Sequence, residues 1–322
     1  MKADDDLYEP FRQILWSDVE AAKSFPAVRP VLAHYTSIAT LDAIMSNDEL
    51  WFSNPLFMND VEELRFGILE GIQAFHRNEA IRMACGSDER CKVLAEAFSA
   101  YYAHFERKHA FDTYVLCLSE HEPEDTDGRL SMWRGYGSNG NGAAIVFDSA
   151  KIDVNDGSPL IFDRVTYASS AKRREWIEGK LTEFAERLHV QNVPTDKLYL
   201  PAHALFERIK VFALFTKHQG FEEEREWRAV YFPDRDGDHR LHSMFSYAIG
   251  RHGVEPKLRF KVAPIDGVTG TDFSLSKLVH RILLGPSLSN QLAITAVRRM
   301  LEQVRKPELC ERVFASTTPY RA

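Results

Sequence analysis

Cysteine is scarce in this chain and follows no functional spacing. The four cysteines, Cys85, Cys91, Cys117 and Cys310, form no C-x-x-C pair and no cluster with histidines at the spacing of a zinc site. This excludes a small disulfide-stapled fold and favours free thiols in a reducing cytoplasm. We therefore expect a cytoplasmic protein.

Long apolar runs and a secretory leader are also missing. No run approaches the ~18 apolar residues of a membrane-spanning helix. The first residues, MKADDDLYEPFRQ, are acidic and lack the apolar stretch of a signal peptide. The sequence therefore predicts no membrane partner.

An excess of positive charge is absent. The 40 Lys and Arg residues against 47 Asp and Glu residues give a formal net charge of −7, which argues against broad binding to nucleic acid or to anionic membranes. A local basic patch remains compatible with this balance. With 322 residues, of which 44% are hydrophobic and 27% charged, the chain has the composition of an ordinary globular protein.

Helical and strand patterns are mixed along the chain, without internal repeats. They predict an α+β fold with a mixed or antiparallel sheet and flanking helices. Residues 1–30 are expected to form an N-terminal helical segment, with a helix around residues 8–25. Residues 31–322 are expected to form a single α+β domain with helical insertions at about residues 61–110 and 169–217.

The first candidate site lies between residues 33 and 60. A strand end carries His34, and Thr36 or Ser37 is the expected N-cap of a helix whose apolar face starts at Ile38. An imidazole, hydroxyls and free backbone N–H groups at one helix start can hold a sugar phosphate. The alternative is a hydrogen-bonded structural histidine followed by ordinary capping.

The second candidate site is a glycine-rich run after the strand at residues 113–119. Four glycines lie within ten positions of Trp133, Arg134 and Tyr136. A strand follows at residues 143–148. Glycines let a backbone approach a ligand closely, and an aromatic ring supplies a stacking surface. A glycine-rich hairpin would explain the glycines alone. The acidic loop at residues 121–128 lacks calcium-loop spacing, so a solvated loop is favoured there.

The third candidate site is the strand at residues 226–232. Alternation places Glu226 and Arg228 on one face, and Glu224 on the same side if the strand has already begun. Two neighbouring carboxylates would repel each other, and one can then carry a raised pKa suited to acid–base chemistry. The alternative is an exposed ladder of opposite charges that contributes little to stability.

The remaining histidines give weaker signals. The loop at residues 233–253 holds three aspartates with His239 and His242, and a hairpin tip with solvated charges is favoured there over a metal site. His76, His104 and His109 are expected on helix surfaces, because no second ligand stands at i+4 with a carboxylate between.

Six short motifs, taken in order, resemble a bacterial domain-of-unknown-function family, number 2971. They are HYTS at 34–37, FSNP at 52–55 with Asn59 and Asp60 following, SMW-x2-YG at 131–137, E-x-EWR at 224–228, ILLGP at 282–286 and PYR at 319–321. The resemblance spans nearly the entire chain. Because members of that family are largely uncharacterised, it implies a fold more than an activity.

A more distant resemblance is to the ADP-ribosyltransferases, including DNA-modifying toxins and RNA 2′-phosphotransferases. Those enzymes open with a His-x-Thr or His-x-Ser strand, carry an aromatic ring in mid-chain and end the active site with a late glutamate. His34 with Thr36 resembles the first element, Tyr136 or Trp133 the second and Glu226 the third. The Glu-Arg-Glu at 224–226 is similar to the E-x-E of the arginine-modifying branch, and Ser131 or Tyr35 can equally take the place of the ring.

This resemblance implies an ADP-ribosyltransferase-like core that uses NAD as a substrate and requires no metal. His34 would bind a ribose hydroxyl, Tyr136 would stack on the nicotinamide ring, and Glu226 would stabilise the charge that develops as nicotinamide leaves. Arg134 or Arg228 would meet the pyrophosphate. Further residues expected to bind the dinucleotide are Tyr35, Thr36, Ser53, Asn54, Ser131, Trp133 and Glu224.

Two other classes of function stay open. One is a non-catalytic module that senses a nucleotide or nucleic acid, as in phage defence. The other is a structural interaction protein. For the enzyme, the acceptor of ADP-ribose can be protein, DNA, RNA or water.

Overall fold

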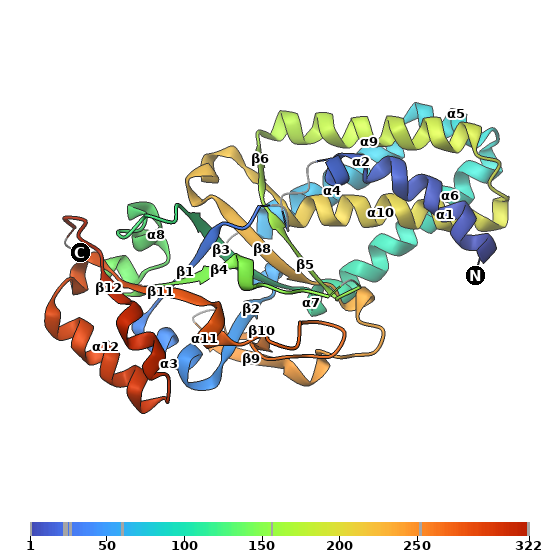
Figure 1. Ribbon diagram of the computed structural model, residues 1–322. Coiled ribbons are helices and arrows are strands. Elements are labelled where there is room, and N and C mark those ends of the chain that lie inside the picture. Colours follow the sequence, from blue (N-terminus) through green and yellow to red (C-terminus); the bar gives the residue numbers. More distant parts are fainter. Residues whose placement is uncertain are drawn as a thin grey trace. The chain divides into compact units, whose positions relative to one another are not determined.

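Figure 1 shows the chain as a computed structural model that describes residues 2–21, 25, 28–58, 61–155, 157–250 and 253–320. The chain divides into two compact units. Unit 1 comprises Met1–Ser24, Pro55–Asp112 and Val165–Phe221. Unit 2 comprises Phe25–Asn54, Thr113–Arg164 and Glu222–Ala322. Both expected helical insertions, 61–110 and 169–217, fall entirely in unit 1, and the expected N-terminal segment falls in unit 1 up to residue 24.

Unit 1 is mainly helical. The helix α10 lies at its centre, packs against α1, α4 and α6, and buries residues all round its surface (Figure 1). A short parallel pair, β6 with β7, completes the unit. Its helices and strands are α1 (Lys2–Leu15), α2 (Ser17–Ala21), α4 (Val61–Arg77), α5 (Glu79–Cys85), α6 (Asp88–His104), a π-helical turn (Phe105–His109), α7 (Ala110–Asp112), β6 (Thr166–Ala168), α9 (Ser170–Val190), α10 (Tyr199–Leu214) and β7 (Thr216–His218).

Local sequence signals explain these helices. A stripe of apolar residues in α4 buries Leu64, Ile68 and Phe75, as a 3.6-residue period requires. Gly86 ends α5 in the left-handed conformation, and Ser87 caps α6.

The first helix differs from the prediction. The helix expected around residues 8–25 is two helices, and α1 begins at Lys2. Asp4 and Asp5 lie in its first turn, where carboxylates stabilise the positive end of the helix dipole. The acidic start of the chain is therefore part of the helix.

Unit 2 is built on a ten-stranded sheet. The strands run in the order β12-β11-β4-β1-β3-β2-β10-β9, while β8 pairs with β3 and β5 pairs with β8. The pair β11 and β12 is parallel, and the other pairs are antiparallel, so the predicted α+β class with a mixed sheet and flanking helices is confirmed. The elements are β1 (Val31–Thr36), α3 (Ile38–Asn47), β2 (Glu49–Ser53), β3 (Tyr114–His121), α8 (Leu130–Gly135), β4 (Ala143–Asp148), β5 (Leu160–Arg164), β8 (Glu226–Tyr231), β9 (Phe245–Gly250), β10 (Gly253–Lys261), α11 (Leu275–Leu278), β11 (Val279–Leu284), α12 (Gln291–Gln303) and β12 (Val313–Ala315).

The two faces of this sheet carry different clusters. The larger core cluster includes Leu32, Leu118 and Trp227, together with the apolar side of α12. The smaller cluster includes Ala33 and Tyr35 of β1 with Trp133 of α8. Because neighbouring residues of a strand point to opposite faces, β1 contributes alternately to both clusters.

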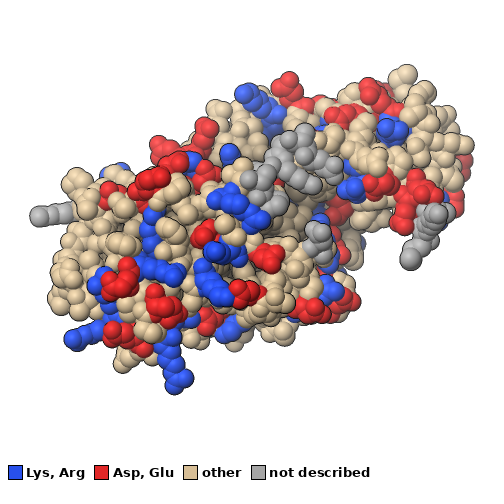
Figure 2. Space-filling view, in the orientation of Figure 1, with Lys and Arg blue, Asp and Glu red and all other residues tan. Residues whose placement is uncertain are grey.

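Charges of both signs are interspersed on the surface in view, as Figure 2 shows. Such mixing produces no broad field of one sign, in line with the modest net charge. Within the described residues, no helix is both long and apolar enough to cross a membrane. The four cysteines are free.

Candidate functional site

The strand register separates His34 from Glu226. Ala33 of β1 lies opposite Ser119 of β3, and Ser119 lies opposite Glu226 of β8. Paired residues share a face of the sheet, so Glu226 shares the face of Ala33, and His34 points to the other face. We expected both side chains to line one cleft, and the register does not bring them together.

His34 is engaged with the neighbouring strand. Its side chain is half-buried, and Nδ1 lies 3.5 Å from the backbone oxygen of Cys117 in β3. Burial lowers the pKa of His34, because a low-dielectric surrounding disfavours the charged imidazole. A neutral, sheet-bound imidazole matches the alternative of a structural histidine.

Glu226 and Arg228 form a buried ion pair. Arg228 donates from Nε and Nη2 to the two carboxylate oxygens of Glu226, at 2.7 and 3.2 Å. The two residues are 3% and 5% exposed. The alternation predicted their common face, but the exposed ladder is wrong, because water is excluded from both. Two parallel hydrogen bonds between a guanidinium and a carboxylate form a strong and geometrically specific pair.

Tyr136 and Glu224 are brought together at the surface. The Tyr136 hydroxyl donates to Glu224 Oε1 at 3.1 Å across 88 positions of sequence. Tyr136 is 45% exposed and Glu224 is half-buried. Ser119 Oγ donates to the backbone oxygen of Glu224 at 2.7 Å, which anchors this acid to the end of β3. The predicted mid-chain ring therefore meets Glu224, the first acid of E-x-E, and not Glu226, the acid predicted as the third element.

Arg225 shapes the backbone between the two acids. Its φ of +42° lies in the left-handed region, which a side chain other than glycine rarely adopts. Its guanidinium pairs with Glu120 and Glu122, and the Trp227 indole also donates to Glu120, at 2.7 Å. Burial alone would raise the pKa of Glu120, but the hydrogen bonds from Trp227 and Arg225 hold it below its usual range.

A buried polar chain links β1 to the loop after β3. The Tyr35 hydroxyl is hydrogen-bonded to His121 Nε2 at 2.7 Å and accepts a second bond, of 2.9 Å, from the Arg129 backbone N–H. His121 Nδ1 lies 3.4 Å from Asp125 Oδ2, an electrostatic contact rather than an aligned hydrogen bond. Asp125 Oδ1 accepts from the N–H groups of Asp127 and Gly128. These hydrogen-bonded residues are not among the predicted sites. Their signal in the sequence is a histidine, His121, at a strand end, followed by Asp125 four positions later.

Burial dominates the charge state of His121. It lowers the pKa of His121 to about 4, against the attraction of Asp125 and with the help of Arg129, Arg281 and Arg225. The folded protein therefore holds this imidazole neutral, whereas the unfolded chain binds a proton near the ordinary pKa of about 6.5.

Stability is expected to fall between pH 6.5 and pH 4. The unfolded state binds the His121 proton first, so the stabilisation present above about pH 6.5 is lost as the pH falls, by roughly 1–3 kcal/mol. Urea unfolding of the protein and of His121→Gln across this range measures it. The lowered pKa values of His34 and His280 act in the same direction in the unaltered protein and in His121→Gln. The difference between the two proteins in the slope of unfolding free energy against pH therefore isolates His121. Equal slopes would contradict the prediction.

Trp133 is a core residue. It is fully buried, meets Tyr35 edge-to-face at 4.8 Å between ring centroids, and donates from Nε1 to the Asp127 backbone oxygen at 2.9 Å. It therefore offers no free surface for stacking, and of the two predicted rings only Tyr136 is exposed. On the same helix, Ser131 and Arg134 are exposed, and the Arg134 guanidinium lies 5.3 Å from the centroid of the Tyr320 ring.

Two glycines of the glycine-rich run approach the chain's own atoms. A Cβ at Gly137 would lie 2.5 Å from the Trp133 ring, and one at Gly142 would lie 2.1 Å from the Thr36 backbone oxygen. Both positions therefore admit no larger side chain. Close packing within the fold accounts for these glycines without a ligand.

The other predicted binding residues serve the fold at separate points. Thr36 is buried at the end of β1. Asn54 is buried and donates to the Thr113 backbone oxygen at 3.1 Å. Ser53 lies opposite Val115, four positions along β3 from Ser119, and accepts from a lysine, Lys257, at 3.0 Å. Asn59, Asp60 and Arg321 of the motif set lie outside the described residues.

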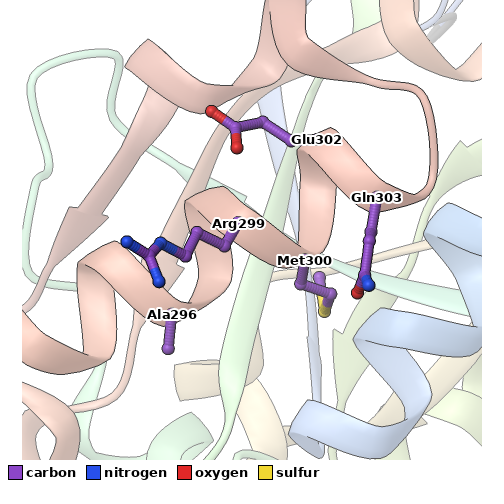
Figure 3. Close-up of a pocket in the computed structure, with 5 residues that line it drawn as sticks. All are labelled: Ala296, Arg299, Met300, Glu302 and Gln303. Atoms are coloured by element: carbon purple, nitrogen blue, oxygen red, sulfur yellow. The ribbon is translucent and has the colours of Figure 1, made fainter.

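A shallow hollow of about 650 Å³ lies along α12. Figure 3 shows its lining, Ala296, Arg299, Met300, Glu302 and Gln303. None of these residues belongs to the predicted site. Among the described residues no group of three or more histidines, cysteines or acids is placed to hold a metal ion.

Comparison with known proteins supports part of the expected resemblance. No curated protein and no solved structure matches the chain. Residues 132–229, a stretch that contains Tyr136, Glu224 and Glu226, match the model of one family, described as Protein of unknown function (DUF2971).

Proposed function

We propose that this protein uses NAD as a substrate at the Tyr136–Glu224 pair and transfers ADP-ribose to an acceptor or to water. The observation that carries the proposal is the 3.1 Å hydrogen bond between these two side chains. It joins an exposed aromatic ring to the first acid of the Glu-Arg-Glu motif, and both belong to the stretch that matches the family model.

The chemistry follows from the two side chains. The exposed Tyr136 ring offers a face for the nicotinamide ring. The Glu224 carboxylate can accept a hydrogen bond from a ribose hydroxyl and stabilise the positive charge that develops on the ribose. The bond between the ribose carbon and the nicotinamide nitrogen breaks, nicotinamide leaves as a neutral molecule, and the acceptor forms the new bond to the ribose and loses its proton.

Two arginines have different places in this scheme. Arg134 is exposed two positions before Tyr136, where its guanidinium can meet a pyrophosphate. Arg228 is committed to Glu226 inside the protein, so it supports the sheet beneath the site. His34, on the other face, has no part in the reaction.

A second candidate function is nucleotide binding without turnover. It is favoured by the buried pairing of Glu226, the acid that resembles the catalytic glutamate, with Arg228. A sensing module would keep the ligand contacts of Tyr136 and Glu224 and lack a second reactive acid.

One experiment separates the candidates. Purified protein is incubated with NAD, and released nicotinamide is measured for the unaltered chain, Glu224→Gln and Tyr136→Phe. We expect roughly a tenfold or larger loss of rate in Glu224→Gln. Glu223→Gln is the matched control. The Glu223 side chain neighbours Glu224 in the sequence and is exposed, and Arg129 contacts only the Glu223 backbone oxygen, at 2.8 Å.

The remaining outcomes are decisive. A melting temperature that rises when NAD is added, without nicotinamide release, would establish the binding module in place of the enzyme. Equal nicotinamide release by all variants would remove the activity from this site. If NAD neither raises the melting temperature nor is cleaved, both candidates are abandoned.

A further inference from the structure

Two exposed imidazoles lie side by side in the loop between β8 and β9. His239 Nδ1 and His242 Nε2 are 3.1 Å apart, and the ring centroids are 4.1 Å apart with an interplanar angle of 40°. Two nitrogens bound to one metal ion at the usual distance for zinc lie about 2.9–3.4 Å from each other, depending on the ligand angle. The observed separation falls within this interval.

A hydrogen bond between the rings explains the geometry less well. In a linear N–H···N bond of this length the two rings would extend away from each other, with centroids about 5.4 Å apart. The observed 4.1 Å places the rings beside each other. The two nitrogens therefore lie next to each other, as two neighbouring ligands of one metal ion do.

The loop backbone is built to present this pair. The buried Asp236 carboxylate accepts from the backbone N–H groups of Arg240 and Leu241 and from the Tyr231 hydroxyl, at 2.9–3.0 Å. His239 adopts a left-handed backbone with φ of +56°, a conformation that is costly for a side chain other than glycine. The loop thus keeps His239 close to His242 at the expense of backbone strain.

We propose that His239 Nδ1 and His242 Nε2 bind one divalent transition-metal ion of the class that prefers imidazole, such as Zn²⁺, Ni²⁺ or Cu²⁺. Water fills the other coordination positions, since both rings are exposed. The site lies outside the proposed NAD site and is independent of that function.

Nearby carboxylates distinguish this pair from a second histidine pair in the chain. Arg240, between the two histidines, is itself paired with Asp238. Asp236, a buried carboxylate, interacts electrostatically with His242, and a negative charge beside the pair attracts a cation. In unit 1, His104 Nε2 and His109 Nε2 are 3.2 Å apart across a π-helical turn. That pair is flanked by Arg107 and Lys108, whose charges oppose a cation, and it serves as a matched control.

The test uses the full-length chain without an affinity tag, freed of metal with a chelator. Isothermal titration with ZnCl₂ gives the number of ions bound per chain, and electron paramagnetic resonance with CuCl₂ counts the nitrogen ligands. We expect the double variant H239A/H242A to bind one Zn²⁺ fewer than the unaltered chain and to lose a Cu²⁺ centre with two nitrogen ligands. We expect H104A/H109A to keep that centre.

The proposal fails if H239A/H242A binds as many Zn²⁺ ions as the unaltered chain. It fails equally if H104A/H109A, rather than H239A/H242A, loses the two-nitrogen Cu²⁺ centre. Because both replaced side chains are exposed, the variant is expected to melt as the unaltered chain does without metal. If it does not fold, the single variant His242→Gln carries the same comparison, with one nitrogen ligand fewer as the expected result.

Discussion

Gly142→Ala is expected to lower the free energy of unfolding by roughly 3 kcal/mol or more. A Cβ at this position would lie 2.1 Å from the backbone oxygen of Thr36 and 2.8 Å from that of Gly137. Backbone atoms cannot turn away as a flexible side chain can, and Thr36 is held in β1 opposite Ala143. The substitution must therefore push β1 and β4 apart where Thr36 ends β1 and Ala143 begins β4. Urea unfolding of the purified variant measures the loss.

Gly135→Ala is the matched control for this prediction. Gly135 is the last residue of α8, and a Cβ there would meet nothing within 4 Å. Alanine in a helix is favoured over glycine by up to about 1 kcal/mol, so this variant is expected to be as stable as the unaltered protein or slightly more so. If both variants unfold at the same urea concentration, the close approach of the Thr36 backbone oxygen does not make glycine necessary at position 142.

Trp133→Ala is expected to lower the free energy of unfolding by about 3–5 kcal/mol. The side chain is fully buried in the smaller cluster, with Tyr35, Val146 and Leu283 around it. Its indole also satisfies the Asp127 backbone oxygen. The substitution leaves a cavity and removes the donor of a buried hydrogen bond, and both effects act in the same direction.

Tyr136→Ala distinguishes the core role of Trp133 from a binding role three positions later, just past the end of α8. Tyr136 is 45% exposed, so its loss is expected to change stability by only about 0.5 kcal/mol. Nicotinamide release would fall in this variant if the proposed function holds. A Trp133→Ala variant as stable as Tyr136→Ala would show that α8 does not depend on its buried indole.

Local patterns predicted individual elements well. The stripe of apolar residues in α4, the cap at Ser37 and the helix α12 follow from side-chain spacing and capping chemistry. The strand at residues 113–119 was recognised because its β-branched and apolar run is typical of a doubly buried strand. In each case the determining interactions lie within a few residues of the chain.

The site was predicted less well, for two reasons. Trp133 and Tyr136 are equally aromatic in the sequence. Only the tertiary structure makes Trp133, inside α8, a core residue and Tyr136, just past the end of α8, an exposed one. The role of His121 depends on Tyr35, 86 positions earlier in the chain. A local pattern contains neither fact.

The sequence by itself determined which residues of one strand share a face, because side chains alternate with a period of two. It placed Glu226 with Arg228 on β8 and separated His34 from Tyr35 on β1. Only the tertiary structure decided which strand faces meet across the sheet, since register depends on contacts between segments far apart in the chain. That register left His34 on the opposite face from Glu226. The fold of the segments after α8 and before β8 brought Tyr136 beside Glu224, 88 positions away.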